Sequence, residues 1–292
     1  MTQPDAALAH LLRVLDLRPT GHDRFQGITE QDEGRLFGGL VLGQSVVAAG
    51  RTVAAGDIHS LHGYFLRAGR PAKPIDYVVE RIRDGRNFTG RRVTAYQDGD
   101  DMIFEASISF VTSEEGVSYQ RPMPAETVAP EGQPSWWETL APAPDQQRER
   151  FRRNWVNPID VRAAEAGGLR PISERLPRRL VWGKPVGPLP EDPIVHAAAI
   201  AYFSDSGMIA TVASVLGVWQ PGGATASLDH AIWWHHPPRF DDWLLYETDS
   251  PIAHAARGLI WGGMYTQDGV RTVSVAQEGL FRQPAPKAPP IG

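Results

Sequence analysis

The sequence predicts an α+β protein in which one module occurs twice, each copy a curved antiparallel sheet wrapped around an apolar helix. Two repeats indicate the duplication: Ser60-Leu61 recurs 167 residues later as Ser227-Leu228, and Gln97-Asp98-Gly99 recurs 170 residues later as Gln267-Asp268-Gly269. A third observation is that several strand-like segments follow one apolar helix in each half. With 292 residues, 42% of them hydrophobic, each half is long enough to bury a core of its own.

The first module is expected to begin with a helix and to continue as an antiparallel meander. Leucines on one helical face predict a helix over residues 6–15, which Pro19-Thr20-Gly21 should end. The small apolar residues of segment 36–53 predict a buried helix that packs closely against the sheet. Strands are predicted over 25–29, 60–66, 75–84, 88–97 and 102–111.

The second module is expected to repeat this order after a connector. Prolines punctuate the polar stretch 113–158, which predicts a connector with one helix at 145–153. A long apolar helix is predicted over 193–216. Strands are predicted over 159–162, 179–186, 226–234, 243–250, 255–267 and 270–282.

A helix that is apolar on every side needs cover all round, and a strongly curved antiparallel sheet provides it. This arrangement is the hotdog fold, so we expect a tandem (double) hotdog whose copies pair edge to edge. The expected domains are an N-terminal hotdog (1–113), a proline-rich connector (114–158), a C-terminal hotdog with the catalytic residues (159–283) and a flexible tail (284–292).

Composition excludes several classes of function. The net charge of −5 argues against a nucleic-acid partner. The chain has no cysteine, which excludes disulfides, thiolate zinc sites and cysteine nucleophiles. His235 and His236 form no metal site, because adjacent residues on a strand point to opposite faces, so no metal is expected. No cofactor is expected either. A polar N-terminus and the absence of any run of eighteen apolar residues predict a cytoplasmic protein without stable membrane association.

One carboxylate stands out because it lies in the predicted apolar helix. An unpaired charge at Asp205 would cost several kcal/mol, so it needs hydrogen-bond partners or a task. The repeat spacing gives Gly38 as its counterpart in the first module. Gln277 likewise has Ser107 as its counterpart, whereas Ser227 keeps a serine at position 60. This asymmetry predicts one active site per chain.

Short motifs run through the chain in a fixed order. They are Phe37-Gly38-Gly39 with Gly43-Gln44, residues 59–67 (HSLHGYFLR), Val79-Glu80-Arg81 with Arg83-Asp84-Gly85, Ser227-Leu228-Asp229-His230, residues 265–269 (YTQDG), and Gln277-Glu278-Gly279. In these motifs, which span nearly the whole chain, the protein resembles the acyl-CoA thioesterase II family of double-hotdog enzymes, which act on choloyl-CoA and on medium- to long-chain acyl-CoA.

The resemblance implies hydrolysis of acyl-CoA by a catalytic trio at Asp205, Ser227 and Gln277, with serine where some members carry threonine. Asp205 would take a proton from water that Ser227 and Gln277 orient, without a covalent intermediate. Gly38 and Gly39 are candidates for oxyanion or substrate binding through their backbone N–H groups.

Histidines and arginines give further candidates. A histidine on a strand beside the core is most often a structural hydrogen bonder, which is our interpretation of His230, while His62 is retained as a candidate substrate contact. Candidates for binding the phosphates of coenzyme A are Arg83, Arg86, Arg91 and Arg92.

Two alternatives stand beside hydrolysis. A hotdog hydratase needs a paired aspartate and histidine, but His196 lies nine residues before Asp205. A non-catalytic acyl-CoA binding protein would carry the trio only as a remnant. The expected partner is acyl-CoA, in lipid and fatty acid metabolism. Pairing of outer sheet surfaces also predicts a homo-oligomer, either a dimer or a tetramer.

Overall fold

The computed structural model describes residues 3–29, 34–139, 157–166, 175–176, 178–217 and 224–282. The helix predicted at 145–153 and the tail at 284–292 lie outside these residues. Within them, the stretch Pro193–Leu216 has the length and hydropathy of a membrane span, but 61% of its most apolar window is buried inside the protein. Burial to that extent is typical of a core helix.

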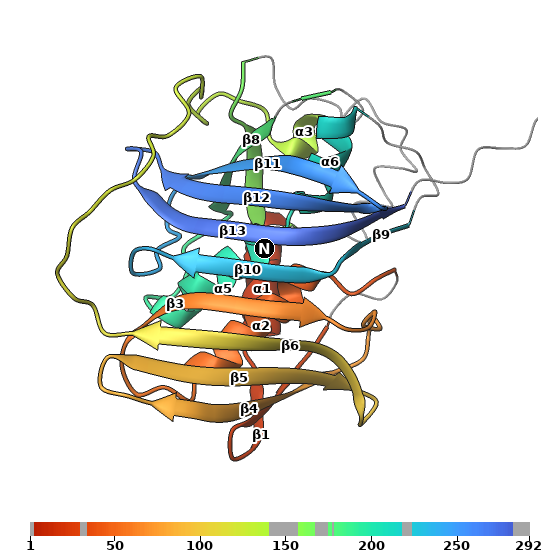
Figure 1. The fold of residues 1–292 in the computed structure, drawn as a ribbon, viewed down its shortest axis with the longest axis vertical. Helices are drawn as coiled ribbons and strands as arrows, with labels where there is room; N and C mark the ends of the chain where they lie inside the picture. Colours follow the sequence, from red (N-terminus) through yellow and green to blue (C-terminus); the bar gives the residue numbers. More distant parts are fainter. Residues whose placement is uncertain are drawn as a thin grey trace, which may run out of the picture.

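The described residues form thirteen strands in one antiparallel sheet (Figure 1). Those of the first half are β1 (Arg18–Gly21), β2 (Arg24–Gly27), β3 (Asp57–Phe65), β4 (Ile75–Asp84), β5 (Phe88–Gln97) and β6 (Asp101–Val111). Those of the second half are β7 (Ile159–Ala163), β8 (Arg178–Pro185), β9 (Ala224–Ser227), β10 (Asp229–Trp234), β11 (Leu244–His254), β12 (Arg257–Thr266) and β13 (Arg271–Arg282).

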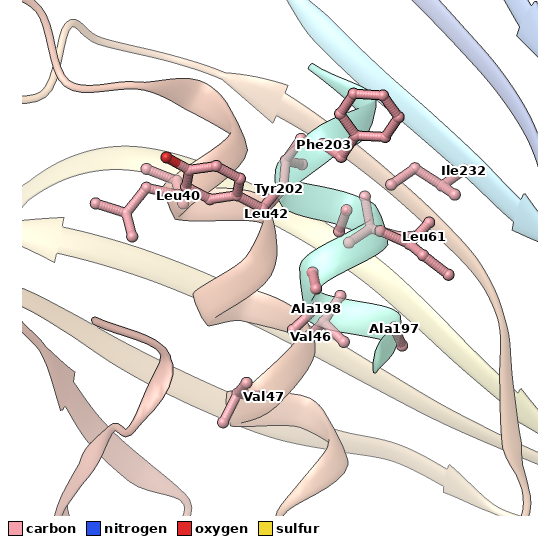
Figure 2. Packing of buried hydrophobic residues seen from close by; sticks show 14 of the residues in the cluster. Leu40, Leu42, Val46, Val47, Leu61, Ala197, Ala198, Tyr202, Phe203 and Ile232 are labelled. Carbon is pink, nitrogen blue, oxygen red and sulfur yellow. The ribbon is translucent and has the colours of Figure 1, made fainter. Parts of the chain in front are cut away.

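The two halves meet in the middle of this sheet. Its strand order is β1-β2-β4-β5-β6-β3-β10-β13-β12-β11-β8-β7, with β9 beside β13. Strands β3 and β10 pair antiparallel, from Tyr64 opposite Asp229 to Ser60 opposite Trp233. Side chains from both halves, including Leu61 and Ile232, belong to one hydrophobic core cluster (Figure 2). The fold is therefore the predicted double hotdog, with two sheets joined edge to edge.

Helices cover one face of the sheet (Figure 1). They are α1 (Gln3–Leu15), α2 (Gly38–Gly50), α5 (Pro193–Ser204) and α6 (Met208–Leu216), with the short α3 (Trp136–Thr139) near β7. The central pair, α2 and α5, lies side by side and buries apolar side chains on nearly all sides (Figure 2). This is the helix cover that the all-apolar segments predicted.

The glycines of α2 face α5 rather than the sheet, which corrects the expected packing. A Cβ atom on Gly39 would lie 2.4 Å from the carbonyl oxygen of Tyr202, and one on Gly43 would lie 3.0 Å from that of Ala198. The contacting residue numbers increase along α2 and decrease along α5, so the two helices run antiparallel. The missing side chains let the two backbones come into contact, and the N-terminus of α2 lies beside the C-terminus of α5.

Several predicted boundaries are wrong. The expected single helix over 193–216 is broken between α5 and α6, where Gly207 adopts a left-handed φ of 80°. Glycine tolerates this conformation because it has no Cβ atom. The segment Pro19–Gly21, expected only to end the first helix, forms part of β1. The strand predicted over 226–234 is two strands, β9 and β10, which are interrupted at Leu228, although the backbone N–H of Leu228 still bonds to Glu278 of β13.

Candidate active site

The break after α5 places Asp205 at the helix C-terminus, facing the N-terminus of α2. The backbone N–H of Gly39 donates to Oδ2 of Asp205 at 3.0 Å. The first N–H groups of an α-helix have no partner inside the helix, and the helix dipole favours a negative charge there. The contact therefore needs both halves of the chain, one supplying the carboxylate and the other the helix N-terminus.

The structure brings Ser227 and Gln277 to the same carboxylate. Ser227 ends β9 and lies opposite Gly279 of β13, two residues beyond Gln277. Its hydroxyl donates to Oδ1 of Asp205 at 3.3 Å. The Gln277 side-chain Nε2 donates to the Ser227 hydroxyl oxygen at 2.9 Å. Two strands and a helix end thus converge on one carboxyl group.

Asp205 has the titration behaviour that a general base needs near neutral pH. Burial raises its pKa to about 7, against the lowering effect of hydrogen bonds from Gly39, Ser227 and Gln277. Desolvation penalises the charged form of a carboxyl group, and these three donors offset only part of that penalty. A base with a pKa near the working pH is efficient, because enough of it is ionised while its affinity for a proton stays high.

A fourth side chain, His230 of β10, belongs to this group although sequence reasoning treated it as structural. Its Nδ1 lies 2.5 Å from Oε1 of Gln277, and its Nε2 lies 2.8 Å from the hydroxyl of Ser204. Burial lowers the pKa of His230 to about 4, so its ring is neutral at physiological pH. The only sequence signal was its place beside Asp229 in the Ser-Leu-Asp-His motif.

The two glycines at the start of α2 take different positions. A Cβ atom on Gly38 would lie 2.8 Å from Oδ2 of Asp205 and 2.9 Å from the ring of Phe65, so a larger residue there would have to displace both side chains. The N–H of Gly39 is already engaged by Asp205. Gly38 therefore borders the space in front of the carboxylate, whereas Gly39 holds the carboxylate itself.

Two expectations from the sequence, a substrate contact at His62 and the pairing of Gln277 with Ser107, do not agree with the structure. His62 is exposed on the outer face of β3, where its ring packs edge-on against Trp233 with centroids 4.9 Å apart. Ser107, the spacing counterpart of Gln277, also faces outward, whereas Gln277 is 1% exposed and points inward. The repeat spacing thus misses the register of the last strand by one residue, which reverses the face on which a strand side chain lies.

The predicted phosphate-binding role of Arg91 is wrong. The side chain is 2% exposed and donates to the hydroxyl and the carbonyl of Thr52, just beyond α2, and to the carboxylate of Asp84. A buried guanidinium whose donors are engaged in this way is structural. Among the residues that the structure describes, no cluster of three or more His, Asp or Glu side chains could hold a metal ion.

Comparison with known proteins identifies the family. The profile described as "Acyl-CoA thioesterase" matches residues 150–280, and the "Acyl-CoA thioesterase N-terminal domain" profile matches residues 29–111. Human acyl-coenzyme A thioesterase 8 is 37% identical over 92% of this chain and 88% of its own length. Acyl-CoA thioesterase 2 of Haemophilus influenzae is 33% identical over 94% of this chain and 98% of its own.

A solved structure agrees with this result. The crystal structure of an acyl-CoA thioesterase II, TesB2, from Mycobacterium marinum superposes with a TM-score of 0.77 at 37% identity, covering 94% of this chain and 99% of that one. The chain therefore belongs to the acyl-CoA thioesterase family, whose members are hydrolases.

Proposed function

We propose that this protein hydrolyses medium- to long-chain fatty acyl-CoA to a free fatty acid and coenzyme A, and that Asp205, Ser227 and Gln277 carry the reaction. The observation that carries the proposal is the hydrogen-bonded group itself: a carboxylate with a pKa of about 7, held by donors from both halves of the chain. Family membership supports the reaction class.

In the proposed mechanism Asp205 acts as general base. A water held by Ser227 and Gln277 gives a proton to the carboxylate and attacks the thioester carbonyl, so its oxygen becomes bonded to the acyl carbon. The tetrahedral intermediate then collapses, the C–S bond breaks, and the coenzyme A thiolate takes the proton. No covalent bond to the enzyme forms in this sequence.

The developing oxyanion needs a preorganised donor, and we assign that role to the N–H of Gly38. This group lies in the first turn of α2, where N–H groups have no intrahelical partner and the helix dipole favours negative charge. The absence of a side chain lets the substrate approach the backbone closely. Gly39 in this assignment holds Asp205 rather than the oxyanion.

Apolar side chains beside the carboxylate support a fatty acyl substrate. Phe65 borders Gly38, and the rings of Phe37 and Tyr202 pack edge to face with centroids 4.9 Å apart next to Gly39. Such surfaces favour an alkyl chain by about 0.8 kcal/mol for each buried methylene group. We place the reaction in cytoplasmic fatty acid metabolism, with which the absence of cysteine is compatible.

The direct test follows thiol release from acyl-CoA substrates, from acetyl to palmitoyl, with wild type and Asp205→Asn. We expect turnover that rises with chain length, and a loss of at least a hundredfold in the variant. Asp249→Asn is the matched control, because this exposed aspartate of β11 has the same chemistry outside the trio. Equal rates for wild type and Asp205→Asn would refute the assignment.

The alternative of a non-catalytic acyl-CoA binding protein makes a different prediction. It requires tight binding of palmitoyl-CoA without thiol release from any substrate of the series. The hydratase alternative finds no support in the described site, because His196 accepts a hydrogen bond from the N–H of Phe240 and its Nε2 lies 3.6 Å from Asp241 rather than near Asp205.

A further inference from the structure

We infer that His230 is a positioning residue of this site: held by Ser204, it fixes the side-chain amide of Gln277 so that the NH₂ group faces Ser227 and the attacking water. The inference rests on the proposed hydrolytic function of Asp205, Ser227 and Gln277, and it adds two residues that do not touch substrate.

Four hydrogen bonds join the five side chains into a ring that the backbone closes. The links are Ser204 to His230 at 2.8 Å, His230 to Gln277 at 2.5 Å, Gln277 to Ser227 at 2.9 Å and Ser227 to Asp205 at 3.3 Å. The ring closes through the backbone, because Ser204 and Asp205 are consecutive residues. It leaves the end of α5, passes through β10, β13 and β9, and returns to the same helix end. Every member is thus placed by at least one other.

The charge on Asp205 sets the direction of every bond in the ring. A carboxylate only accepts, so the Ser227 hydroxyl donates to it and must accept from the NH₂ group of Gln277. The carbonyl Oε1 of Gln277 then faces His230 and accepts from Nδ1–H. A neutral imidazole with its proton on Nδ1 accepts at Nε2, and there the Ser204 hydroxyl donates.

Without His230 the amide of Gln277 has two orientations of nearly equal shape. The flipped orientation would place Oε1 against Ser227 and remove the donor that orients its hydroxyl. In the native ring a flip would set the NH₂ group against Nδ1–H, two donors 2.5 Å apart, which is strongly unfavourable. With its proton on Nδ1, His230 therefore selects the catalytically useful orientation by repelling the other.

Ser204 makes this selection depend on the charge of Asp205. Its hydroxyl lies 2.9 Å from the carbonyl of Ala201 as well as 2.8 Å from Nε2 of His230, and it has one proton to give. Donation to Ala201 belongs to the reversed ring, in which Nε2 carries the proton. The other titratable group beside Ser204 is Tyr246, whose hydroxyl donates to the Ser204 carbonyl at 2.7 Å. Because ionised Asp205 fixes the direction of the bonds through Ser227 and Gln277, it favours the tautomer of His230 with the proton on Nδ1.

Two substitutions at His230 separate positioning from simple packing. In His230→Asn the amide nitrogen lies the same number of bonds from Cα as Nδ1 and can donate to Gln277. In His230→Gln it lies at the distance of Nε2 and reaches towards Ser204 instead. We expect kcat for palmitoyl-CoA to fall about 10- to 100-fold in His230→Gln with KM changed less than about twofold, and to recover most of that loss in His230→Asn.

The pH profile gives a readout that a structural role would not move. Ser227 donates to Asp205 and Gln277 donates to Ser227, and both lower the pKa of Asp205. A disordered amide should therefore move the acid limb of kcat/KM to higher pH in His230→Gln and leave it in place in His230→Asn. His235→Gln is the matched control, since the His235 ring also bonds to a serine hydroxyl, that of Ser274 at 2.8 Å, but on the exposed surface.

Nitrogen NMR of the histidine rings tests the inference independently of turnover. We expect His230 of the free wild-type enzyme at pH 8 to carry its proton on Nδ1. The Nε2–H tautomer, or equal losses of kcat in His230→Asn and His230→Gln with an unmoved acid limb, would overturn the positioning role. If wild type released no thiol, the proposed function would fail, whereas the tautomer would still report whether the ring has the inferred direction.

Discussion

At the scale of single residues, the burial of Asp205 determines how the enzyme should respond to pH. Only the carboxylate can accept a proton from water, and burial raises its pKa to about 7. We therefore expect kcat/KM for palmitoyl-CoA to rise about tenfold per pH unit below pH 7 and to level off above it. Ser227→Ala removes a donor to the charged form, so its acid limb should lie at higher pH. A limb centred near pH 4, or one that Ser227→Ala leaves unmoved, would exclude Asp205 as the base.

The burial of Asp205 should also make the free energy of unfolding depend on pH. The folded pKa of Asp205, about 7, lies above the ordinary value of 3.8, so the folded state keeps a proton that the unfolded state releases. Its contribution to the free energy of unfolding is thus present at low pH and is lost as pH rises from about 4 to 7, a loss of about 4 kcal/mol.

Asp205→Asn removes this loss, so the free energy of unfolding of the variant minus that of wild type should increase by about 3 kcal/mol between pH 4.5 and pH 7.5. Urea denaturation at each pH measures it. His230 acts in the opposite direction in both proteins, because its lowered pKa of about 4 removes stability as pH falls through 6.5 to 4. A difference that does not change with pH would show that Asp205 titrates as it does in water.

At the scale of elements, close contact between α2 and α5 is what places the helix N-terminus beside the carboxylate. In Gly39→Ala the new methyl group would lie 2.4 Å from the backbone oxygen of Tyr202, which cannot rotate away. In Gly50→Ala the nearest atoms, at 2.7 Å, belong to the side chain of Ile194, which can. We expect Gly39→Ala to lower the free energy of unfolding by about 2 kcal/mol or more, even after the helix propensity gained by alanine.

The control for this prediction is Gly50→Ala, which should stay within about 1 kcal/mol of wild type, since the same gain in propensity offsets a small rearrangement. Chemical denaturation of the two variants in parallel measures the difference. Equal effects of the two substitutions would mean that the helices can separate without cost.

The elements that sequence patterns predicted well are those set by local chemistry. Strands β4 and β5 have the predicted bounds because alternation and turn residues are local signals. The break after α5 was missed, since apolar residues continue on both sides of Asp205 and Gly207 was the only marker within the helix. Boundaries made by a change of direction inside an apolar run depend on tertiary packing, which periodicity does not report.

The site was predictable to a similar extent. A carboxylate within an apolar run singled out Asp205, whereas its supposed repeat counterpart, Gly38, proves to face it across the helix pair. The grouping with Ser227 and Gln277 came from family motifs rather than from spacing. The bond between His230 and Gln277 joins residues 47 positions apart through their side chains. Only the register of β10 against β13 brings them together, and a single sequence carries no signal for it.

At the scale of the whole molecule, the proposed reaction needs both halves, because Gly39 comes from one and Asp205 from the other. The same halves share the β3–β10 ladder and one hydrophobic core cluster. Separate unfolding of either half would expose the helix face and the sheet edge that the other now covers. We therefore expect the chain to unfold as one cooperative unit.

The distribution of tryptophan makes this last expectation easy to measure. All nine tryptophans lie after residue 135, so their fluorescence reports chiefly on the second half, with Trp233 also touching His62 of the first, whereas far-ultraviolet circular dichroism reports on the strands and helices of both. Coincident urea transitions from the two probes are expected for a two-state protein. A dichroism transition with a second step that fluorescence does not follow would show that the first half unfolds by itself, and the core shared by α2 and α5 would then be too weak to hold the site together.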